Sequence, residues 1–316
     1  MTTKHLVDPE LLGLLEIFPK FDYSLEGIAG VRATVEQMSA AIPQPDVPVD
    51  ASSRKIPGLN GAPDISVSIY RPKGVRDQLP AYLHIHGGGY VAGSPALSDA
   101  QNRCIAHEAQ CVVISVDYRL APETAHPGQL QDCYAALLWA HENAASLGID
   151  PKRIAVGGES AGGGLAAALA QYSLAQGEVS IVFQVLIYPM LDDRTASAAE
   201  PSPWVGEYAW TRADNRFGWS SILGQKAGLP EAPEFAVPAR AASLKGLPPA
   251  FIGVGSLDLF FEEDVAYAMR LNRDGVTTEL HVYPGAFHAF DLAAEAAVSQ
   301  AAWRNMIAAL KRGLKA

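Results

Sequence analysis

The sequence predicts an α/β fold in which a mostly parallel central sheet is flanked by helices and covered by a helical cap. From about residue 80 onward, short apolar segments alternate with longer segments of helical periodicity. The apolar segments are nearly continuous rather than alternating in polarity, which is typical of parallel strands covered on both faces. A proline-rich and aromatic segment at 189–248 interrupts this alternation and predicts the cap.

The expected elements follow in chain order. Two helical stretches, 6–17 and 25–41, precede a linker at 43–48 whose prolines cannot continue a helix. Residues 64–71 alternate in polarity and predict an antiparallel edge strand. The β/α part then reads as strand 81–85, helix 99–109, strand 111–116, helix 129–143, strand 154–156, helix 165–174, strand 181–187, strand 249–255, helix 261–272, strand 277–283 and helix 293–310.

One serine lies at a strand-to-helix junction that glycines make unusually tight. Ser160 is in the glycine-rich stretch 157–164, after an apolar strand and before an alanine-rich helix. Gly158 and Gly162 lack a Cβ, so strand and helix can approach closely. The turn lifts the serine hydroxyl out of the sheet edge and places the Ala161 N–H at the positive end of the helix. Gly-x-Ser-x-Gly in this context is typical of the nucleophile of α/β-hydrolases, although a glycine-rich turn with a buried serine would match too.

A second glycine cluster follows the expected strand at 81–85. It consists of His86, Gly87, Gly88 and Gly89, and its backbone N–H groups have no side chains in front of them. Fixed N–H donors of this kind form an oxyanion hole, and an HGGG-type loop accompanies the nucleophile turn in lipases and esterases. The alternative is a flexible turn.

A serine nucleophile needs a base, which in this fold follows it in the chain after an acid. Only two histidines come after Ser160. His281 falls inside an expected strand, where a structural role is the simpler interpretation. His288 lies in the loop beyond that strand, where catalytic residues of open α/β sheets gather, so we predict that His288 is the base.

The acid should follow the preceding strand, and Asp258 is the carboxylate at its end. Asp264, in the helix, and Asp274, in the turn after it, are rivals that we expect to cap or to be solvated. Glu262 and Glu263 belong to the first helical turn, where acidic charge suits the helix dipole.

With these motifs in place, the chain resembles the bacterial hormone-sensitive-lipase-like (family IV) carboxylesterases of the α/β-hydrolase superfamily. Further matching segments are Asp-Tyr-Arg-Leu-Ala-Pro-Glu at 117–123, Gly-Ile-Asp-Pro-Lys-Arg-Ile at 148–154 and Ile-Tyr-Pro-Met at 187–190. The resemblance covers roughly residues 65–312. It implies an α/β-hydrolase fold, and the pattern along the chain divides that fold into a cap and a catalytic domain. The N-terminal helical part of the cap is 1–50, the catalytic domain comprises 51–188 and 249–316, and the cap insertion is 189–248.

The resemblance also implies site residues. Gly88, Gly89 and Ala161 would donate the oxyanion N–H groups, and Gly87 would shape the turn. Many relatives carry aspartate in place of Glu159, so the role of this residue stays open, with a hydrogen bond that supports the site as one interpretation. The residues that support the motifs are His86, Gly87, Gly158, Glu159 and Gly162.

The expected activity is hydrolysis of small, short-acyl carboxylic esters through an acyl-enzyme, with Ser160, His288 and Asp258 as the triad and no cofactor or metal. An amidase, a peptidase or an acyltransferase could use the same triad. A ligand-binding receptor on this fold is a further alternative, but such relatives can lose the histidine that this chain retains.

Aromatic residues near the motifs and in the insert are candidates for the substrate pocket. They are Tyr90, Tyr188, Trp204, Tyr208 and Trp210. For any one of them, a place in the core of the cap is the alternative.

The amino-acid composition limits the kinds of partner that the chain is expected to bind. The net charge of −10 argues against nucleic acid and against anionic membrane surfaces, both of which require basic patches. The three cysteines Cys104, Cys111 and Cys133 have no metal-ligand spacing and are expected to be buried free thiols. No signal-peptide core and no apolar stretch of membrane-spanning length is evident, so we expect a cytoplasmic enzyme. Relatives often form dimers, which makes a homodimer a further expectation.

Overall fold

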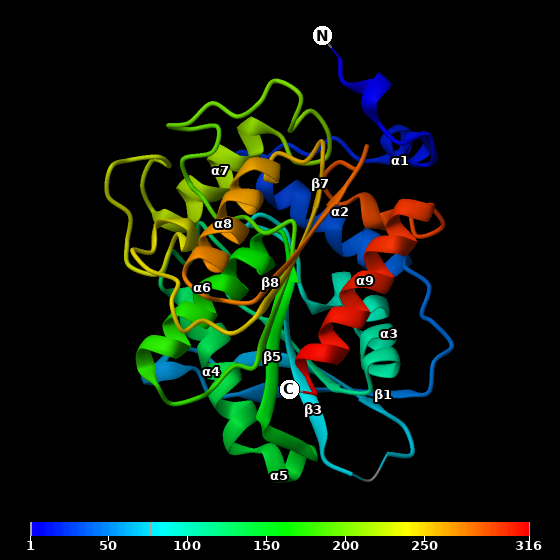
Figure 1. Cartoon of the computed structure of the whole chain (residues 1–316), viewed down its shortest axis with the longest axis vertical. Coiled ribbons are helices and arrows are strands. Elements are labelled where there is room, and N and C mark those ends of the chain that lie inside the picture. The colour runs from blue at the N-terminus through cyan, green and yellow to red at the C-terminus, as the bar shows by residue number, and fades with distance from the viewer. Residues whose placement is uncertain (1, 76, 316) are drawn as a thin grey trace.

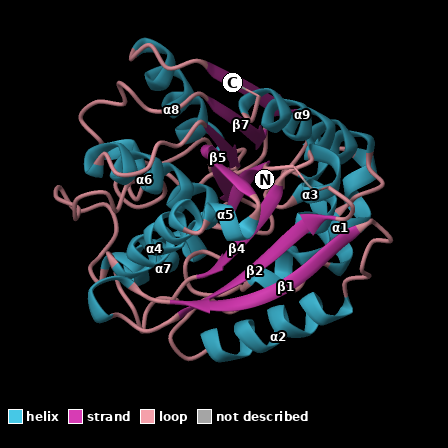
Figure 2. Ribbon diagram, turned by 90° about the horizontal axis from the view of Figure 1, so that it is seen from below, coloured by secondary structure: helices cyan, strands magenta, loops and turns pink. Residues whose placement is uncertain are grey.

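A single eight-stranded sheet runs through the molecule, with helices on both of its faces (Figure 1, Figure 2). The structure is a computed structural model and describes residues 2–75 and 77–315. The strands are β1 (Val49–Ile56), β2 (Ile65–Pro72), β3 (Leu79–Ile85), β4 (Val112–Asp117), β5 (Ile149–Glu159), β6 (Phe183–Ile187), β7 (Ala250–Gly255) and β8 (Thr278–Tyr283).

Two helices precede the first strand, and the others alternate with the strands from β3 onward. The helices are α1 (Leu12–Ile17), α2 (Ile28–Ala41), α3 (Asp99–Ala109), α4 (Gly128–Glu142), α5 (Ala144–Leu147), α6 (Ala161–Gln176), α7 (Arg212–Leu223), α8 (Phe261–Arg273) and α9 (Ala297–Gly313). Short 3₁₀ turns occur at Lys4–Leu6, Pro9–Leu11, Leu59–Gly61, Pro95–Ser98, Pro238–Arg240 and Phe290–Leu292.

The strand order is β1-β2-β4-β3-β5-β6-β7-β8. All pairings from β4 to β8 are parallel, whereas β2 is antiparallel to both of its neighbours. The prediction of a mostly parallel α/β sheet flanked by helices is therefore confirmed.

The apolar strands bury both of their faces. Along β4, Val112 and Ile114 pack into the core beneath α4 and α6, while Val113 between them packs on the other side against α3 and α9. Successive strand side chains point to opposite faces, so a strand with a layer of helices on each side must be apolar at every position. Figure 2 shows these two layers, with α3 and α9 on one side and α4 and α6 on the other.

One expectation about the sheet edge was wrong. The strand expected at 64–71 is β2, which is internal because β1 pairs with it over residues 49–56. The six central residues of β1 are exposed and polar or small, so no apolar alternation marks this strand in the sequence. A charged and exposed edge strand of this kind resists pairing with other chains.

The acidic residues at the start of α8 also differ from expectation. Asp264 was expected to cap or to be solvated, but it is 0% exposed, and no hydrogen-bond partner in the described chain reaches either of its oxygens. Burial raises the pKa of Asp264 well above its usual value. Its neighbour Glu263 is buried as well, and it accepts hydrogen bonds from the N–H groups of Leu191 and Asp192.

Arg32 is the residue of α2 that connects the N-terminal segment to the loops after β3 and β4. Arg32 Nε donates to the Val91 carbonyl at 2.8 Å, and Nη2 donates to the Ala121 carbonyl at 2.9 Å. The guanidinium also forms a bidentate pair with Glu123, with both N–O distances at 2.7 Å. This hydrogen bonding lowers the pKa of Glu123 to about 2.

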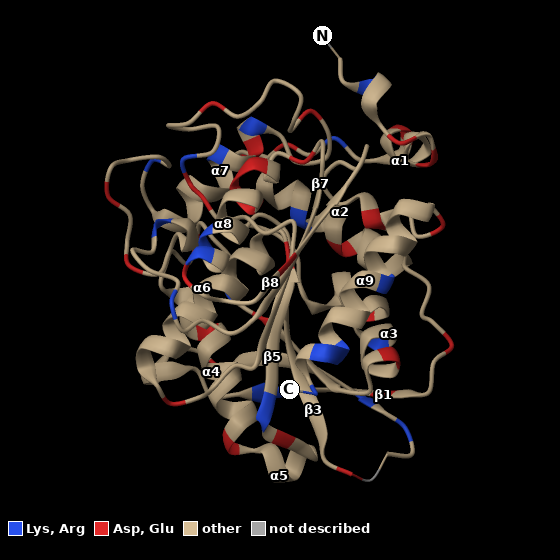
Figure 3. Ribbon diagram, viewed as in Figure 1, with Lys and Arg blue, Asp and Glu red and all other residues tan. Residues whose placement is uncertain are grey.

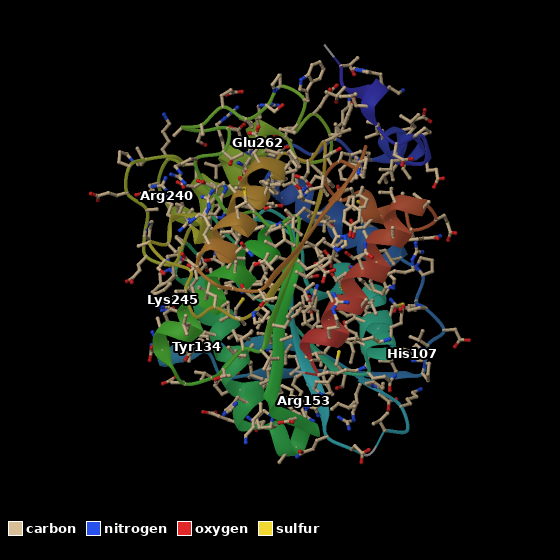
Figure 4. All side chains as sticks on the ribbon, viewed as in Figure 1. His107, Tyr134, Arg153, Arg240, Lys245 and Glu262 are labelled. Atoms are coloured by element: carbon tan, nitrogen blue, oxygen red, sulfur yellow. The ribbon has the colours of Figure 1, made fainter. Side chains whose placement is uncertain are left out.

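The strand register brings the ends of β3, β5, β7 and β8 to one edge of the sheet. Ile85 pairs with Gly158, and Gly255 pairs with Tyr283, so the loops after these strands emerge together. In Figure 4 the labelled Arg153, on β5, marks the opposite end of the sheet, and Glu262, at the start of α8, marks this end. Helices α1 and α7 also lie at this end (Figure 1). No helix in the described part of the chain combines the length and apolar character needed to cross a membrane.

Candidate active site

The turn between β5 and α6 holds Ser160 in a strained backbone conformation, with φ of 56° and ψ of −121°. Its N–H donates to the Ile187 carbonyl at 2.9 Å, which fixes the turn against β6. A Cβ on either Gly158 or Gly162 would run into the carbonyl oxygen of Ile85. Glycine is therefore required on both sides of the serine, because the strand, the turn and β3 touch through their backbones.

Ser160, His288 and Asp258 form one hydrogen-bonded chain. The Nε2 atom of His288 lies 2.9 Å from Ser160 Oγ, and its Nδ1 atom lies 2.8 Å from Asp258 Oδ2. The other oxygen of Asp258 accepts from the Phe260 N–H at 2.9 Å. An ionised carboxylate can only accept, so a hydrogen bond from Nδ1 to it would leave Nε2 facing the serine hydroxyl as the acceptor. Asp258 is 0% exposed, while Ser160 and His288 are each 6% exposed. The hydrogen bond between His288 and Asp258 is therefore shielded from solvent.

Aromatic rings enclose the imidazole. Tyr188 packs edge-on against His288 with 4.7 Å between ring centroids, and Phe260 packs similarly at 5.2 Å. The Tyr188 hydroxyl donates to Asp291 Oδ1 at 2.7 Å. Burial raises the pKa of the Asp291 carboxyl.

The glycine loop after β3 presents N–H groups beside the serine. Gly88 and Gly89 have positive φ angles of 118° and 63°, which glycine adopts freely. Within residues 2–75 and 77–315, no acceptor is hydrogen-bonded to the N–H groups of Gly88, Gly89 or Ala161. Gly87, Gly88 and Gly89 line the same cavity as Ser160. The arrangement can donate hydrogen bonds to an oxygen that develops negative charge next to the serine.

His86 shapes this loop from inside. Its Nδ1 atom lies 2.8 Å from the Gly87 carbonyl oxygen, and its ring stacks on Tyr118 with 4.2 Å between centroids. Burial lowers the pKa of His86 to about 3, so the ring is neutral at physiological pH. A neutral ring buried inside the fold is not placed to exchange protons with a substrate.

Glu159 makes the hydrogen bond that the sequence left open, and its partner is His84 on β3. The His84 Nε2 atom lies 3.0 and 3.1 Å from the two carboxylate oxygens. On its other side, the His84 Nδ1 atom contacts Ser115 Oγ at 3.0 Å and Asn102 Nδ2 at 3.1 Å. This buried network lies directly behind the serine turn. His84 and Glu159 come together because β3 and β5 are neighbouring strands of the sheet. A polar residue near the end of each of these two strands was the signal available in the sequence.

The cavity in front of the serine has a volume of about 170 Å³. It includes Ser160 and His288 and is walled on one side by segments far away in sequence. Its further lining residues are Phe18, Phe21, Tyr23, Val35, Met38, Gly87, Gly88, Gly89, Leu97, Ser98, Gln101, Glu159, Tyr188, Ala209, Trp210, Ala289, Asp291 and Leu292. A larger hollow of about 360 Å³ lies beside α6 and residues 232–247, and it contains none of the triad.

The five aromatic candidates divide into two groups. Tyr188 and Trp210 line the cavity. Tyr90 is buried, packs on Trp219 and donates its hydroxyl to the Met190 carbonyl, so it does not line the cavity.

Trp204 and Tyr208 are also absent from the cavity wall. Trp204 is 43% exposed, and Tyr208 packs against Phe287.

Sequence reasoning missed several lining residues. Phe18, Phe21 and Tyr23 come from the connection between α1 and α2, which was expected only to belong to a cap. Asp291 and Leu292 follow His288 closely in the chain, and this short spacing was the available signal.

Comparisons with known proteins agree with this geometry. A family model described as the alpha/beta hydrolase fold matches residues 82–292. The carboxylesterase NlhH of Mycobacterium tuberculosis is 37% identical over 316 residues, which cover 98% of this chain and 97% of that protein. An arylesterase of Saccharolobus solfataricus is 31% identical and matches 90% of this chain and 92% of its own length.

Solved structures give the same result. The structure of a bacterial heroin esterase matches 100% of both chains with a TM-score of 0.90 and 38% identity. The esterase LipW from Mycobacterium marinum matches 99% of this chain and 98% of its own, with a TM-score of 0.86 and 32% identity. The chain therefore belongs to the hormone-sensitive-lipase-like carboxylesterases of the α/β-hydrolase superfamily, and it is a carboxylic ester hydrolase.

Proposed function

We propose that this esterase hydrolyses small, short-acyl carboxylic esters through an acyl-enzyme intermediate. In this proposal Ser160 is the nucleophile, His288 is the base and Asp258 orients the imidazole. The observation that carries the proposal is the unbroken chain of two hydrogen bonds, 2.9 Å and 2.8 Å long, from Ser160 Oγ through His288 to Asp258. This is the arrangement that nucleophilic catalysis by a weakly acidic hydroxyl requires.

The proposed reaction has two halves. Ser160 Oγ attacks the ester carbonyl carbon while its proton passes to His288 Nε2. The carbon–oxygen bond to the alcohol then breaks, and the leaving alcohol takes that proton. Water repeats both steps on the acyl-enzyme, releasing the acid and restoring the serine. Throughout, the buried Asp258 carboxylate stabilises the imidazolium that forms twice per cycle.

We assign the N–H groups of Gly88, Gly89 and Ala161 to the tetrahedral oxyanion. Their lack of any internal acceptor supports this assignment, since donors that are fixed in advance need no rearrangement when charge develops. Residues 1–50 and 189–248 are proposed to form the cap, because Tyr23 and Trp210 from these two segments wall the cavity and pack together at 5.0 Å between ring centroids.

The preference for small substrates is supported by the cavity volume. At about 170 Å³ it is smaller than pockets that enclose drug-sized ligands, which are typically about 300–1,000 Å³. A long acyl chain would have to displace the aromatic residues of the cap.

The test is a series of p-nitrophenyl esters from acetyl to palmitoyl, measured on the wild type and on Ser160→Ala. We expect the highest kcat/KM at short chains and its loss in the variant by a factor on the order of 10⁴ or more. Ser52→Ala, on the exposed face of β1, serves as the matched control. A maximum at long chains would contradict the acyl limit, and a folded Ser160→Ala variant with wild-type rates would contradict the mechanism. Amide turnover exceeding matched ester turnover would instead favour an amidase.

A further inference from the structure

The active-site cavity is acidic as well as aromatic. Among the described residues that line it, the carboxylates of Glu159 and Asp291 are present, but no lysine or arginine is. A neutral ester needs neither carboxylate for recognition, and hydrolysis through the triad uses neither.

The two carboxylates differ in how far their charge is compensated. Glu159 is paired with the buried His84, and its side chain is only 12% exposed. No lysine or arginine of the described chain pairs with Asp291; the nearby charge that acts on it is that of His288 when protonated, and its side-chain hydrogen bond is from the Tyr188 hydroxyl to Oδ1. Its negative charge is therefore held in a half-buried position with Oδ2 left for a ligand, an arrangement that a bound cation would stabilise.

The same cavity also offers aromatic surfaces. Phe21 packs against Tyr23 at 5.7 Å between centroids, and Tyr23 packs against Trp210 at 5.0 Å. These rings and Phe18 line the cavity together with Asp291. Aromatic faces attract ammonium groups, and the attraction strengthens where water is excluded. Aromatic rings and a carboxylate in one cavity are a combination that recognises cations.

The contacts of Asp291 indicate which end of the substrate it would meet. It is tied to Tyr188, whose ring packs directly against His288, the residue proposed to protonate the leaving alcohol. Asp291 therefore lies close to the imidazole that would protonate the alcohol portion.

We infer that the preferred substrates of this enzyme are esters whose alcohol portion carries a positively charged amine or quaternary ammonium group, held between Asp291 and the cap aromatics. This inference rests on the proposed ester hydrolysis at Ser160 and adds a class of substrate to it.

The experiment uses a pair of esters of the same shape. Acetylcholine carries a quaternary ammonium group, and 3,3-dimethylbutyl acetate places a neutral tert-butyl group in the same position. Each competes with p-nitrophenyl acetate, so an inhibition constant is obtained whether or not the competitor is itself turned over. The two constants are measured in the wild type, in Asp291→Asn and in Glu142→Gln. Glu142 is an exposed acid at the end of α4, and its replacement changes the net charge by the same amount.

We expect the wild type to bind acetylcholine roughly tenfold more tightly than its neutral analogue. The ratio should fall towards one in Asp291→Asn and stay unchanged in Glu142→Gln. A wild-type ratio of one or below, a ratio that Asp291→Asn leaves unchanged, or no inhibition by either ester would overturn the inference. Because only the ratio is interpreted, a general loss of activity in Asp291→Asn does not affect the result.

Failure of the proposed function gives a different pattern. If the wild type turns over p-nitrophenyl acetate and Ser160→Ala does not, the triad stands whatever the ratio is. If the two proteins turn it over equally, the reaction mechanism is wrong, and the inference about the alcohol portion falls with it.

Discussion

Replacing Gly89 by alanine should damage both the stability and the activity of this enzyme. The new Cβ would lie 2.9 Å from Trp210 Cζ3 and closer still to Cη2, where unstrained carbon atoms stay about 3.5–4.0 Å apart. Overpacking of this kind costs about 1–3 kcal/mol, and alanine at the φ of 63° adds about 1–2 kcal/mol. The expected loss in free energy of unfolding is therefore about 2–5 kcal/mol. A displaced Gly89 N–H should also lower kcat by about 10²–10³.

Gly275 provides the matched control. It also has a positive φ, of 81°, but a Cβ there would meet nothing within 4 Å. Gly275→Ala should therefore lower the free energy of unfolding only by the cost of the positive φ, about 1–2 kcal/mol, and leave kcat unchanged.

Urea unfolding and p-nitrophenyl acetate kinetics on both variants separate the two contributions. Adding Trp210→Leu to Gly89→Ala should show a coupling energy of the size of the clash, about 1–3 kcal/mol. Equal destabilisation of the two glycine variants, together with a wild-type kcat in Gly89→Ala, would refute the assignment of Gly89 to a crowded loop beside the reacting atoms.

Two further predictions follow from Arg32 and His86. Arg32→Met removes the hydrogen bonds of α2 to Val91, Ala121 and Glu123. Because the guanidinium is partly exposed, we expect the free energy of unfolding in urea to fall by only about 1–2 kcal/mol. The N-terminal segment should be proteolysed faster, and unchanged proteolysis would contradict this role. His86 stays neutral in the folded protein down to about pH 3, whereas the unfolded chain binds its proton below about pH 6.5, so its contribution to stability is present above pH 6.5 and is lost as the pH falls. Urea unfolding should show a loss of about 2 kcal/mol from this group between pH 6.5 and 5, and His86→Asn should lack that part of the slope; identical slopes in the two proteins would contradict the buried neutral ring.

The sheet and the local turns were predictable because they depend on short stretches of sequence. Near-continuous apolar segments identified the parallel strands, and the glycines around Ser160 identified a turn where backbones touch. The polar strand β1 could not be found this way, since its pairing with β2 uses backbone groups that no side-chain pattern reveals.

What the sequence did not reveal depends on packing between distant segments. Phe18 and Phe21 reach the cavity because the N-terminal segment folds back over the sheet domain, where Arg32 and Asp8 bond to distant loops. The burial of Asp264 likewise arises from what the rest of the fold places over the first turn of α8. The expectations of a homodimer and of a cytoplasmic location stay predictions.

The charged residues are scattered along the whole fold (Figure 3), and Asp264 is one of the few that are buried. A buried carboxyl that receives no hydrogen bond is far less costly when it keeps its proton. The formal charge of −10 then overstates the charge of the folded enzyme. Unfolding at neutral pH must release that proton to the solvent, so the heat absorbed on unfolding includes the protonation enthalpy of the buffer. Calorimetry in two buffers that differ in this enthalpy would register the buried carboxyls of the first turn of α8, Asp264 and its neighbour Glu263, whose pKa burial raises as well.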